Sequence, residues 1–198
     1  MILKIMQIGE TLLRTKAQRI SIETLKQPKT QQLIDLMIAT LRDRTGVGLA
    51  APQVGEPLQI IIIEDKKIYH EKLSDELLQA QARKPVGLKI LVNPVLTIED
   101  DGHTNEFFEG CLSVDGYLAV TPRANKVKVS GLDRYGKEIT FTAEGWYARI
   151  LQHEVDHLHG ILYVDRMVSR TFLTERHYVT KWAKTSLKKL TTFINTSR

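Results

Sequence analysis

Residues 153–157 read His-Glu-Val-Asp-His, the pattern in this chain whose residue types and spacing are most typical of metal chemistry. On a helix, side chains four positions apart lie on one face, so His153 and His157 can bind the same metal ion. Glu154 directly follows the first histidine, where its carboxylate can contact a water molecule without binding the ion. The pattern predicts a metal centre, and the alternative is a polar helix face with two solvated histidines.

A catalytic metal needs a third protein ligand and an open coordination position. Downstream of the motif, His159 points away from the shared face, and His177 reaches the site only if the fold brings it back. Upstream, Cys111 is the single cysteine, and its thiolate would be a strong ligand for zinc or ferrous iron. Taken alone, Cys111 is better explained as a small buried apolar residue, which is the common role of a free cysteine, and the ligand role stays open as the alternative.

A third segment, residues 46–53, reads Gly-Val-Gly-Leu-Ala-Ala-Pro-Gln. Its small residues predict a tight loop that a backbone or a ligand can approach closely. The glycines do not follow a predicted strand, which argues against a dinucleotide-binding loop. Gln53 would be an uncharged hydrogen-bond donor at the end of this loop, and the alternative is a surface glutamine after a structural turn.

The composition sets the broad class of the protein. With 198 residues, 42% apolar and 26% charged, the chain is predicted to form one globular domain over residues 1–198. The net charge of +5 is a mild basic bias that serves solubility or weak attraction to nucleic acid or lipid. A lone cysteine suits a reducing compartment, and no apolar run approaches the roughly 20 residues of a membrane span. We therefore expect a cytoplasmic protein, or an organellar one if the chain is a processed form.

The elements that must position these segments follow from hydrophobic periodicity. Residues 28–44 and 145–158 repeat apolar side chains at helical spacing, and residues 174–195 predict a C-terminal amphipathic helix. A buried strand is expected over residues 58–64, followed by a polar surface excursion over 65–87 with a short helix at 73–81. Further strands are expected as a pair within residues 88–98 that breaks at Asn93-Pro94, an extended stretch over 117–120, and a hairpin over 126–132 and 137–142. Short strands followed by a helix, without alternation of strand and helix, predict an α+β fold.

Taken together, the three segments resemble the peptide deformylase family, which is marked by G-x-G-x-A-A-x-Q, E-G-C-x-S and H-E-x-D-H in this order. Residues 46–53, 109–113 and 153–157 match these motifs without a mismatch. The resemblance extends over nearly the whole chain. It implies an α+β fold of mixed or antiparallel β-sheets packed around a central metal-binding helix, with an N-terminal and a C-terminal helix.

The resemblance also implies an activity, the hydrolytic removal of the formyl group from the N-terminal formylmethionine of nascent polypeptides with release of formate. By motif, Cys111, His153 and His157 would bind the metal, and Glu154 would act as general base and acid. The side chain of Gln53 and the backbone N–H of Leu112 would stabilise the oxyanion. The family implies Fe²⁺, which Zn²⁺, Ni²⁺ or Co²⁺ can replace, whereas the ligand set alone is typical of catalytic zinc.

The substrate is expected to need an apolar slot for the methionine side chain. The positions that match the family's substrate-binding residues are Val47, Gly48, Phe107, Glu109, Gly110, Trp146 and Ile150. For each, ordinary core packing is the alternative. Arg149 falls in the same neighbourhood, at the expected mouth of the slot. Asp156 lies off the ligand face of the helix, and the hypothesis is that it pairs with Arg123 and braces that helix. The alternative is a solvated aspartate.

Partners other than the nascent peptide are suggested by one basic helix face. Lys181, Lys184 and Lys188 are spaced three and four residues apart, and Lys189 is adjacent. The face is explained by solvation or by a transient contact with ribosomal RNA at the peptide exit. No membrane or DNA partner is expected.

Two other functions remain as alternatives. A metallopeptidase would share the H-E-x-x-H pattern, but the upstream cysteine counts against it. A non-catalytic binding protein with a structural metal would be expected to lack Glu154 or Gln53, and both are present.

Overall fold

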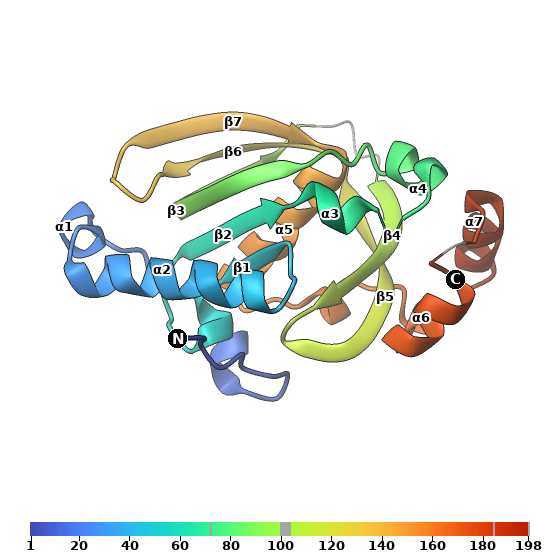
Figure 1. Ribbon diagram of the computed structural model, residues 1–198, viewed down its shortest axis with the longest axis horizontal. Helices are drawn as coiled ribbons and strands as arrows, with labels where there is room; N and C mark the ends of the chain where they lie inside the picture. Colours follow the sequence, from blue (N-terminus) through green and yellow to red (C-terminus); the bar gives the residue numbers. More distant parts are fainter. Residues whose placement is uncertain (72, 100–103, 184, 198) are drawn as a thin grey trace.

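The computed structural model describes residues 1–71, 73–99, 104–183 and 185–197. Within these ranges the chain forms an α+β fold with two antiparallel sheets, as the sequence predicts (Figure 1). The larger sheet has the order β1-β2-β3-β6-β7, and the smaller one has the order β4-β5-β8. The strands are β1 (Gly48–Ala50), β2 (Ile60–Asp65), β3 (Val86–Ile98), β4 (Thr104–Cys111), β5 (Val114–Ala124), β6 (Lys126–Leu132), β7 (Glu138–Glu144) and β8 (Leu173–Thr174).

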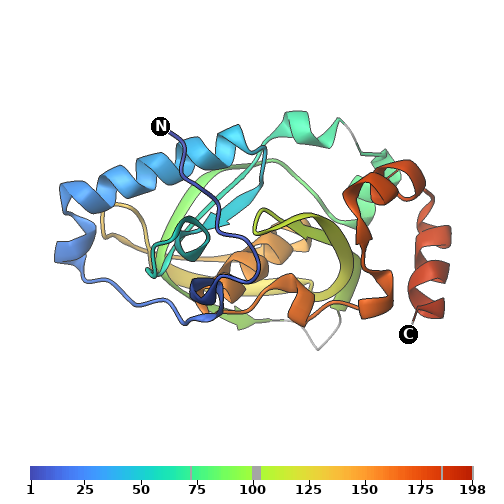
Figure 2. The ribbon, with the colours of Figure 1, turned by 90° about the horizontal axis from the view of Figure 1, so that it is seen from below.

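Helices surround and separate the two sheets. The α-helices are α1 (Ile22–Leu25), α2 (Pro28–Asp43), α3 (Lys67–His70), α4 (Asp75–Ala80), α5 (Gly145–Leu158), α6 (Glu175–Lys181) and α7 (Leu187–Thr196). Helix α5 contacts strands of the large sheet and also β5, so it lies between the two sheets (Figure 2). No helix among the described residues is long and apolar enough to cross a membrane.

Strand β2 shows why the large sheet is covered on both faces. Its residues 60–63 are four isoleucines with no exposed surface. Because successive side chains in a strand point to opposite faces, Ile60 and Ile62 pack in the cluster that contains α2, and Ile61 and Ile63 pack in the cluster that contains α5. A continuous apolar run is what a strand buried on both faces requires.

The predicted strand pair within residues 88–98 is wrong in one respect, because β3 is a single strand from Val86 to Ile98. The Asn93-Pro94 step shifts the register with β6 between Val92 and Val95 and does not end the strand. Asn93 has a φ of +52°, and its side chain bonds the backbone N–H and carbonyl of Ile20. The bulge therefore accommodates Pro94, which has no backbone N–H to donate to β6. Asn93 in turn holds the N-terminal segment to β3 at Ile20.

The surface excursion over residues 65–87 contains the predicted short helix as α4, preceded by the single turn α3. The excursion is held to the sheet by an ion pair, because both guanidinium nitrogens of Arg83 bond the buried carboxylate of Asp65 at 2.8 and 2.9 Å. At its far end, the carbonyl of Gln81 accepts a hydrogen bond from the N–H of Trp146 at 2.8 Å. The excursion is thus anchored at both ends.

The C-terminal segment forms two helices, α6 and α7, where the sequence predicts one. Trp182 packs against Phe193 in a tilted arrangement with ring centroids 4.3 Å apart, and both ring centroids lie within 6.4 Å of that of Phe108 on β4. A straight helix could not bring the two aromatic residues, eleven positions apart, onto the same strand residue. Burial of this cluster therefore explains the break. The prediction of one basic helix face is therefore wrong, because Lys181 ends α6 whereas Lys188 and Lys189 lie on α7. Lys184 lies outside the described residues.

Candidate metal centre

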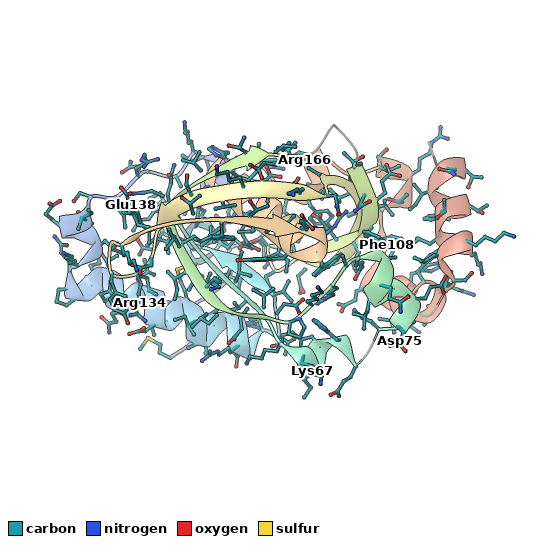
Figure 3. All side chains as sticks on the ribbon, turned by 90° about the horizontal axis from the view of Figure 1, so that it is seen from above. Lys67, Asp75, Phe108, Arg134, Glu138 and Arg166 are labelled. Atoms are coloured by element: carbon teal, nitrogen blue, oxygen red, sulfur yellow. The ribbon has the colours of Figure 1, made fainter. Side chains whose placement is uncertain are left out.

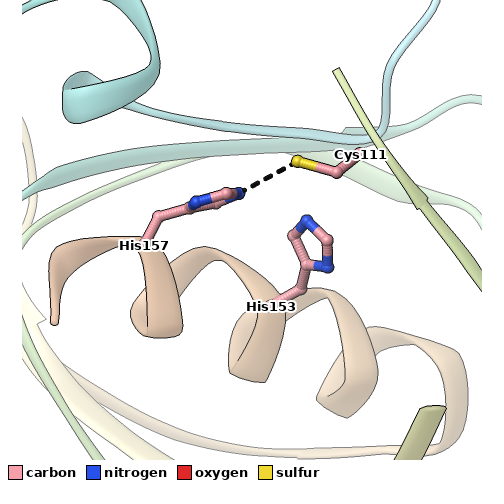
Figure 4. A group of neighbouring side chains, drawn as sticks. All are labelled: Cys111, His153 and His157. Carbon is pink, nitrogen blue, oxygen red and sulfur yellow. Dashed lines mark hydrogen bonds between the residues drawn. The ribbon is translucent and has the colours of Figure 1, made fainter. Parts of the chain in front are cut away.

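Three candidate ligand side chains from distant parts of the chain converge at one point (Figure 4). Their donor atoms, the Cys111 Sγ and one ring nitrogen each of His153 and His157, all lie within 4.8 Å of one another. Sγ is 3.3 Å from Nε2 of His157. Both histidines stand on α5 one turn apart, and Cys111 ends β4. Of the alternatives that the sequence left open, the structure brings Cys111 to the histidines.

Helix α5 begins where the sequence predicts, and Gly145 explains the position. Gly145 has a φ of +61°, and a Cβ atom there would lie 2.6 Å from the carbonyl oxygen of Gln81. Only glycine satisfies both conditions without strain. The helix therefore starts with a fixed direction, which places His153 two turns later facing Cys111.

Glu109 fixes the first histidine and is itself held by two arginines. Its carboxylate lies 3.0 Å from Nδ1 of His153, accepts two bonds of 3.0 Å from Arg123, and accepts one of 2.6 Å from Arg149. Burial alone would raise the pKa of Glu109, but the charge of Arg123, the bond from His153 and the charge of Arg149 outweigh it and hold the pKa well below its usual range. Glu109 is thus a permanent anion that orients the ring of His153.

Asp156 continues this charge network on the opposite side of Arg123. Its carboxylate accepts bonds from Arg123 and from Arg166, the latter at 2.6 and 2.8 Å. The predicted pairing of Asp156 with Arg123 is confirmed. Arg149 lines the cavity described below, in the neighbourhood that the sequence predicts, and it is largely buried, with bonds to Glu109 and to the carbonyls of Thr121 and Asn105.

Glu154 contrasts with these carboxylates. It is 3% exposed, and its Oε2 has no hydrogen-bond partner among the described residues. Burial is the main reason that its pKa rises to about 7. A Cβ atom on Gly48 would lie 2.1 Å from its Oε1, so the glycine leaves the space that this carboxylate occupies. The arrangement suits a group that gains and loses a proton near neutral pH.

Gln53 is held in a defined orientation beside the sulfur. Its Oε1 accepts a bond of 2.8 Å from the N–H of Ala50, which directs Nε2 towards Ser113 Oγ at 3.1 Å and Cys111 Sγ at 3.4 Å. Leu112 lies in the turn between Cys111 and Val114, where β4 and β5 meet. The predicted oxyanion donors therefore flank Cys111.

A cavity of about 630 Å³ opens beside these groups. All seven predicted substrate-binding positions line it, together with Cys111, His153 and Glu154. Arg149 stacks its guanidinium over the rings of Phe107 and Trp146 at 5.4 and 5.6 Å from their centroids. The cavity also has walls that the sequence gives no reason to expect, from residues 73–83 and from α6 and α7.

The three donors fit a divalent metal ion by their chemistry. A thiolate and two imidazoles are ligands that Zn²⁺ and Fe²⁺ accept. Burial, then the charge of His153, lowers the pKa of His157 well below its usual value, which favours the neutral ring that a metal needs. Burial lowers the pKa of His153, but the hydrogen bonds that its ring donates to Cys111 and Glu109 outweigh burial and raise it. Metal binding there would therefore release a proton.

Comparison with known proteins agrees with this site. The model of the polypeptide deformylase family matches residues 2–172. The chain is 48% identical over 170 residues to the chloroplastic peptide deformylase 1A of Solanum lycopersicum, covering 86% of this chain and 61% of that protein. It is 42% identical over 167 residues to the peptide deformylase of Halothermothrix orenii, covering 84% and 94% of the two chains.

A solved structure supports the same relationship. The class I type b peptide deformylase from Acinetobacter baumannii, with Met-Ala-Ser bound, superposes with a TM-score of 0.74 at 34% identity. The superposition covers 84% of this chain and 99% of that one. The chain therefore belongs to the polypeptide deformylase family. It spans about three fifths of the length of the tomato relative.

Proposed function

We propose that the protein is a metal-dependent hydrolase that removes the N-formyl group from the N-terminal formylmethionine of newly synthesised polypeptides and releases formate. The observation that carries the proposal is the convergence of Cys111, His153 and His157 beside a buried Glu154 and an oriented Gln53. Membership of the family supports it. We assign the activity to residues 1–198 as a single catalytic unit.

Cys111, His153 and His157 would hold the metal, and we propose Fe²⁺, for which Zn²⁺, Ni²⁺ or Co²⁺ can substitute. A divalent ion bound there would supply a nucleophile at neutral pH, since it lowers the pKa of water from roughly 16 to about 7. Glu109 keeps the ring of His153 in place through Nδ1, which leaves Nε2 for the ion.

Glu154 carries the proton in the proposed reaction. Its carboxylate takes a proton from the attacking water and delivers it to the nitrogen of the leaving amine. Such a transfer contributes about 10²–10⁴-fold to the rate. A pKa near 7 suits both halves of this role, because the group then exists in both protonation states at neutral pH.

The negative charge that develops on the former carbonyl oxygen needs donors already in place. We assign this role to Nε2 of Gln53 and the backbone N–H of Leu112. Ala50 and Ser113 hold the Gln53 amide in its orientation, so no reorganisation is needed during the reaction. Donors of this kind each contribute about 2.7–4 kcal/mol in acyl transfer. A neutral amide also leaves formate free to depart.

The methionine side chain is assigned to the apolar part of the cavity beside α5. Val47, Phe107, Trp146 and Ile150 line this part, and Gly48, Glu109 and Gly110 lie beside it on β1 and β4. Gly110 has room for a close backbone approach, because a Cβ there would meet only Leu118 and the carbonyl of Tyr117 at 3.4 Å or more.

We also propose that the protein acts where formylated chains are made, in a bacterial cytoplasm or an organelle matrix. A transient contact with ribosomal RNA through Lys181, Lys188 and Lys189 belongs to this proposal. If it is real, co-sedimentation with ribosomes should weaken steeply as salt rises. Replacing the three lysines by glutamine should remove that salt dependence.

The proposed activity is tested by an anaerobic assay of formate release from formyl-Met-Ala-Ser, with metal analysis of the same sample. A peptide with a free N-terminus and internal apolar residues is assayed in parallel. Formate release without internal cleavage is expected. Internal cleavage would instead favour a metallopeptidase, which the family match does not support.

A further inference from the structure

The far end of the active-site cavity is built by a segment beyond the family match. The match ends at residue 172, whereas α6 begins at Glu175. Tyr178 and Trp182 from this region line the same cavity as Cys111 and His153, and so does Leu190 on α7. Helices α6 and α7 lie beside α4 at one end of the molecule in both ribbon views (Figures 1 and 2).

We propose that this end of the cavity, the aromatic wall formed by Phe108, Tyr178, Trp182 and Leu190, binds an apolar side chain of the substrate downstream of its formylmethionine. The proposal rests on the proposed deformylase function and adds a preference within the peptide. It makes Tyr178 and Trp182 specificity-determining residues in a segment that the family match does not cover.

Strand β4 connects the two ends of the cavity. Phe107 and Phe108 are adjacent, so their side chains point to opposite faces of the strand. The Phe107 ring meets Trp146 at 6.5 Å in the proposed methionine slot, whereas the Phe108 ring meets Tyr178 at 5.1 Å. Figure 3 shows Phe108 on the side of the molecule where the C-terminal helices lie. A peptide whose formyl group lies near Cys111 can therefore extend along β4 towards the aromatic wall.

The wall is held in place from the other side by α4. Leu77 of this helix and the preceding Leu73 line the cavity as well. Oε1 of Glu76 accepts a hydrogen bond of 3.3 Å from the N–H of Leu187, the first residue of α7. Helices α4 and α7 are thus joined by a hydrogen bond, and together they form one end of the cavity.

The chemistry of this region indicates the kind of side chain it accepts. The aromatic wall presents only rings and one branched apolar side chain to the cavity. Behind the wall, Phe108 belongs to the same buried apolar cluster as Val120 and Ile194. A cavity of about 630 Å³ lies within the usual range for a bound small molecule. The methionine slot beside α5 uses one part of it. The remaining apolar surface favours leucine or an aromatic residue over a charged one.

The test compares formyl-Met peptides that differ only in where one phenylalanine stands. The series is formyl-Met-Ala, formyl-Met-Ala-Ala-Ala, and the tetrapeptides with Phe at position 2, 3 or 4. For the metal-loaded wild type we expect kcat/KM to be about tenfold higher with Phe at one of these positions than with alanine throughout. Trp182→Ala should remove this preference while leaving kcat/KM for formyl-Met-Ala unchanged.

Controls separate recognition from folding. Val179→Ala changes the residue next to Tyr178 that is 60% exposed and does not line the cavity, so the preference should persist. Leu190→Asn is a second variant of the wall, used if Trp182→Ala is unfolded by circular dichroism, and it should also remove the preference. A wild type with no preference, or folded wall variants that keep it, would overturn the proposal. An equal fall in kcat/KM on every peptide in the wall variants would also overturn the proposal, because it would show that these residues have a structural role. No formate from any peptide would reject the deformylase function itself.

Discussion

Buried carboxylates on the two sides of α5 differ in their hydrogen-bond partners. Towards β4 and β5, Glu109 and Asp156 are each bonded to two arginines. Towards β1, Glu154 is equally buried, yet Oε2 has no partner among the described residues. The arginines hold the pKa of Glu109 well below its usual range, whereas burial raises the pKa of Glu154 to about 7.

This difference separates positioning from proton transfer. With its pKa held that low, Glu109 stays ionised near neutral pH and can fix a histidine ring. A buried carboxylate without arginine partners does not hold a neighbouring side chain in position, but it can exchange a proton near neutral pH. Carboxylates whose environments push their pKa values apart mark the acid–base group of a site. This contrast supports the proposed assignment of proton transfer to Glu154.

The largest effect is expected for Glu154→Gln. The amide keeps the shape of the side chain but cannot carry the proton, so kcat for formate release should fall by about 10²–10⁴-fold or more. Metal content should stay at the wild-type ratio, because Glu154 is not among the three ligands. Glu138→Gln, an exposed position on β7, is the matched control. Full activity of Glu154→Gln would show that the unpaired carboxylate has no role in proton transfer.

Glu109→Gln should affect stability and metal affinity together. Removing this charge leaves Arg123 without one of its two carboxylates and takes from Arg149 the carboxylate that accepts its hydrogen bond. Breaking a buried ion pair of this kind costs about 3–5 kcal/mol of the free energy of unfolding. Loss of the bond to His153 should weaken metal binding about 10–100-fold. Urea denaturation and competition with a chelator measure the two effects. An unchanged metal affinity would argue that Glu109 does not position His153.

Asp156→Asn tests the outer part of the same network and should do less. Arg123 keeps both bonds to Glu109, so no arginine in the interior loses all its partners. Arg166 is 45% exposed at its side chain and can turn to solvent. We expect a loss of about 1–3 kcal/mol in the free energy of unfolding, with metal content retained. A loss as large as that of Glu109→Gln would mean that the two carboxylates act as one unit.

The sequence predicts most of what local patterns determine. The spacing of His153 and His157 predicts the helix face they share, and the apolar period predicts α2 and α5 almost to the residue. The position of Asp156 off that face leaves both a solvated side chain and the pairing with Arg123 open, and the structure shows the pair. The chemistry of the thiolate makes Cys111 a candidate third ligand, but only the resemblance to a family decides between that role and a buried apolar one. No local rule brings the end of β4 to His153, 42 positions later.

Long-range packing is where sequence patterns fail. The break between α6 and α7 depends on Phe108, some 75 residues earlier, and so do the aromatic walls of the cavity. The sequence places Arg149 near the slot but does not predict that Glu109 and two backbone carbonyls bind its guanidinium. In each case the deciding partner lies on another element, and amphipathic periodicity carries no information about it.

The smallest effect is expected for an ion pair outside the site, Arg42 with Glu64, which tests whether burial is what gives the Glu109 network its strength. Arg42 bonds Glu64 at 2.8 and 2.9 Å, but its side chain is 46% exposed. The bond from Arg42 lowers the pKa of Glu64, so the folded state binds this proton more weakly than the unfolded chain does. The contribution to stability is therefore present above the unfolded pKa of about 4.3 and is lost as pH falls through the folded value.

Glu64→Gln should lower the free energy of unfolding by less than about 1 kcal/mol at pH 7. Urea denaturation of both proteins from pH 7 to pH 3 should show the difference shrinking towards zero, and a difference that grows in acid would contradict the assigned sign.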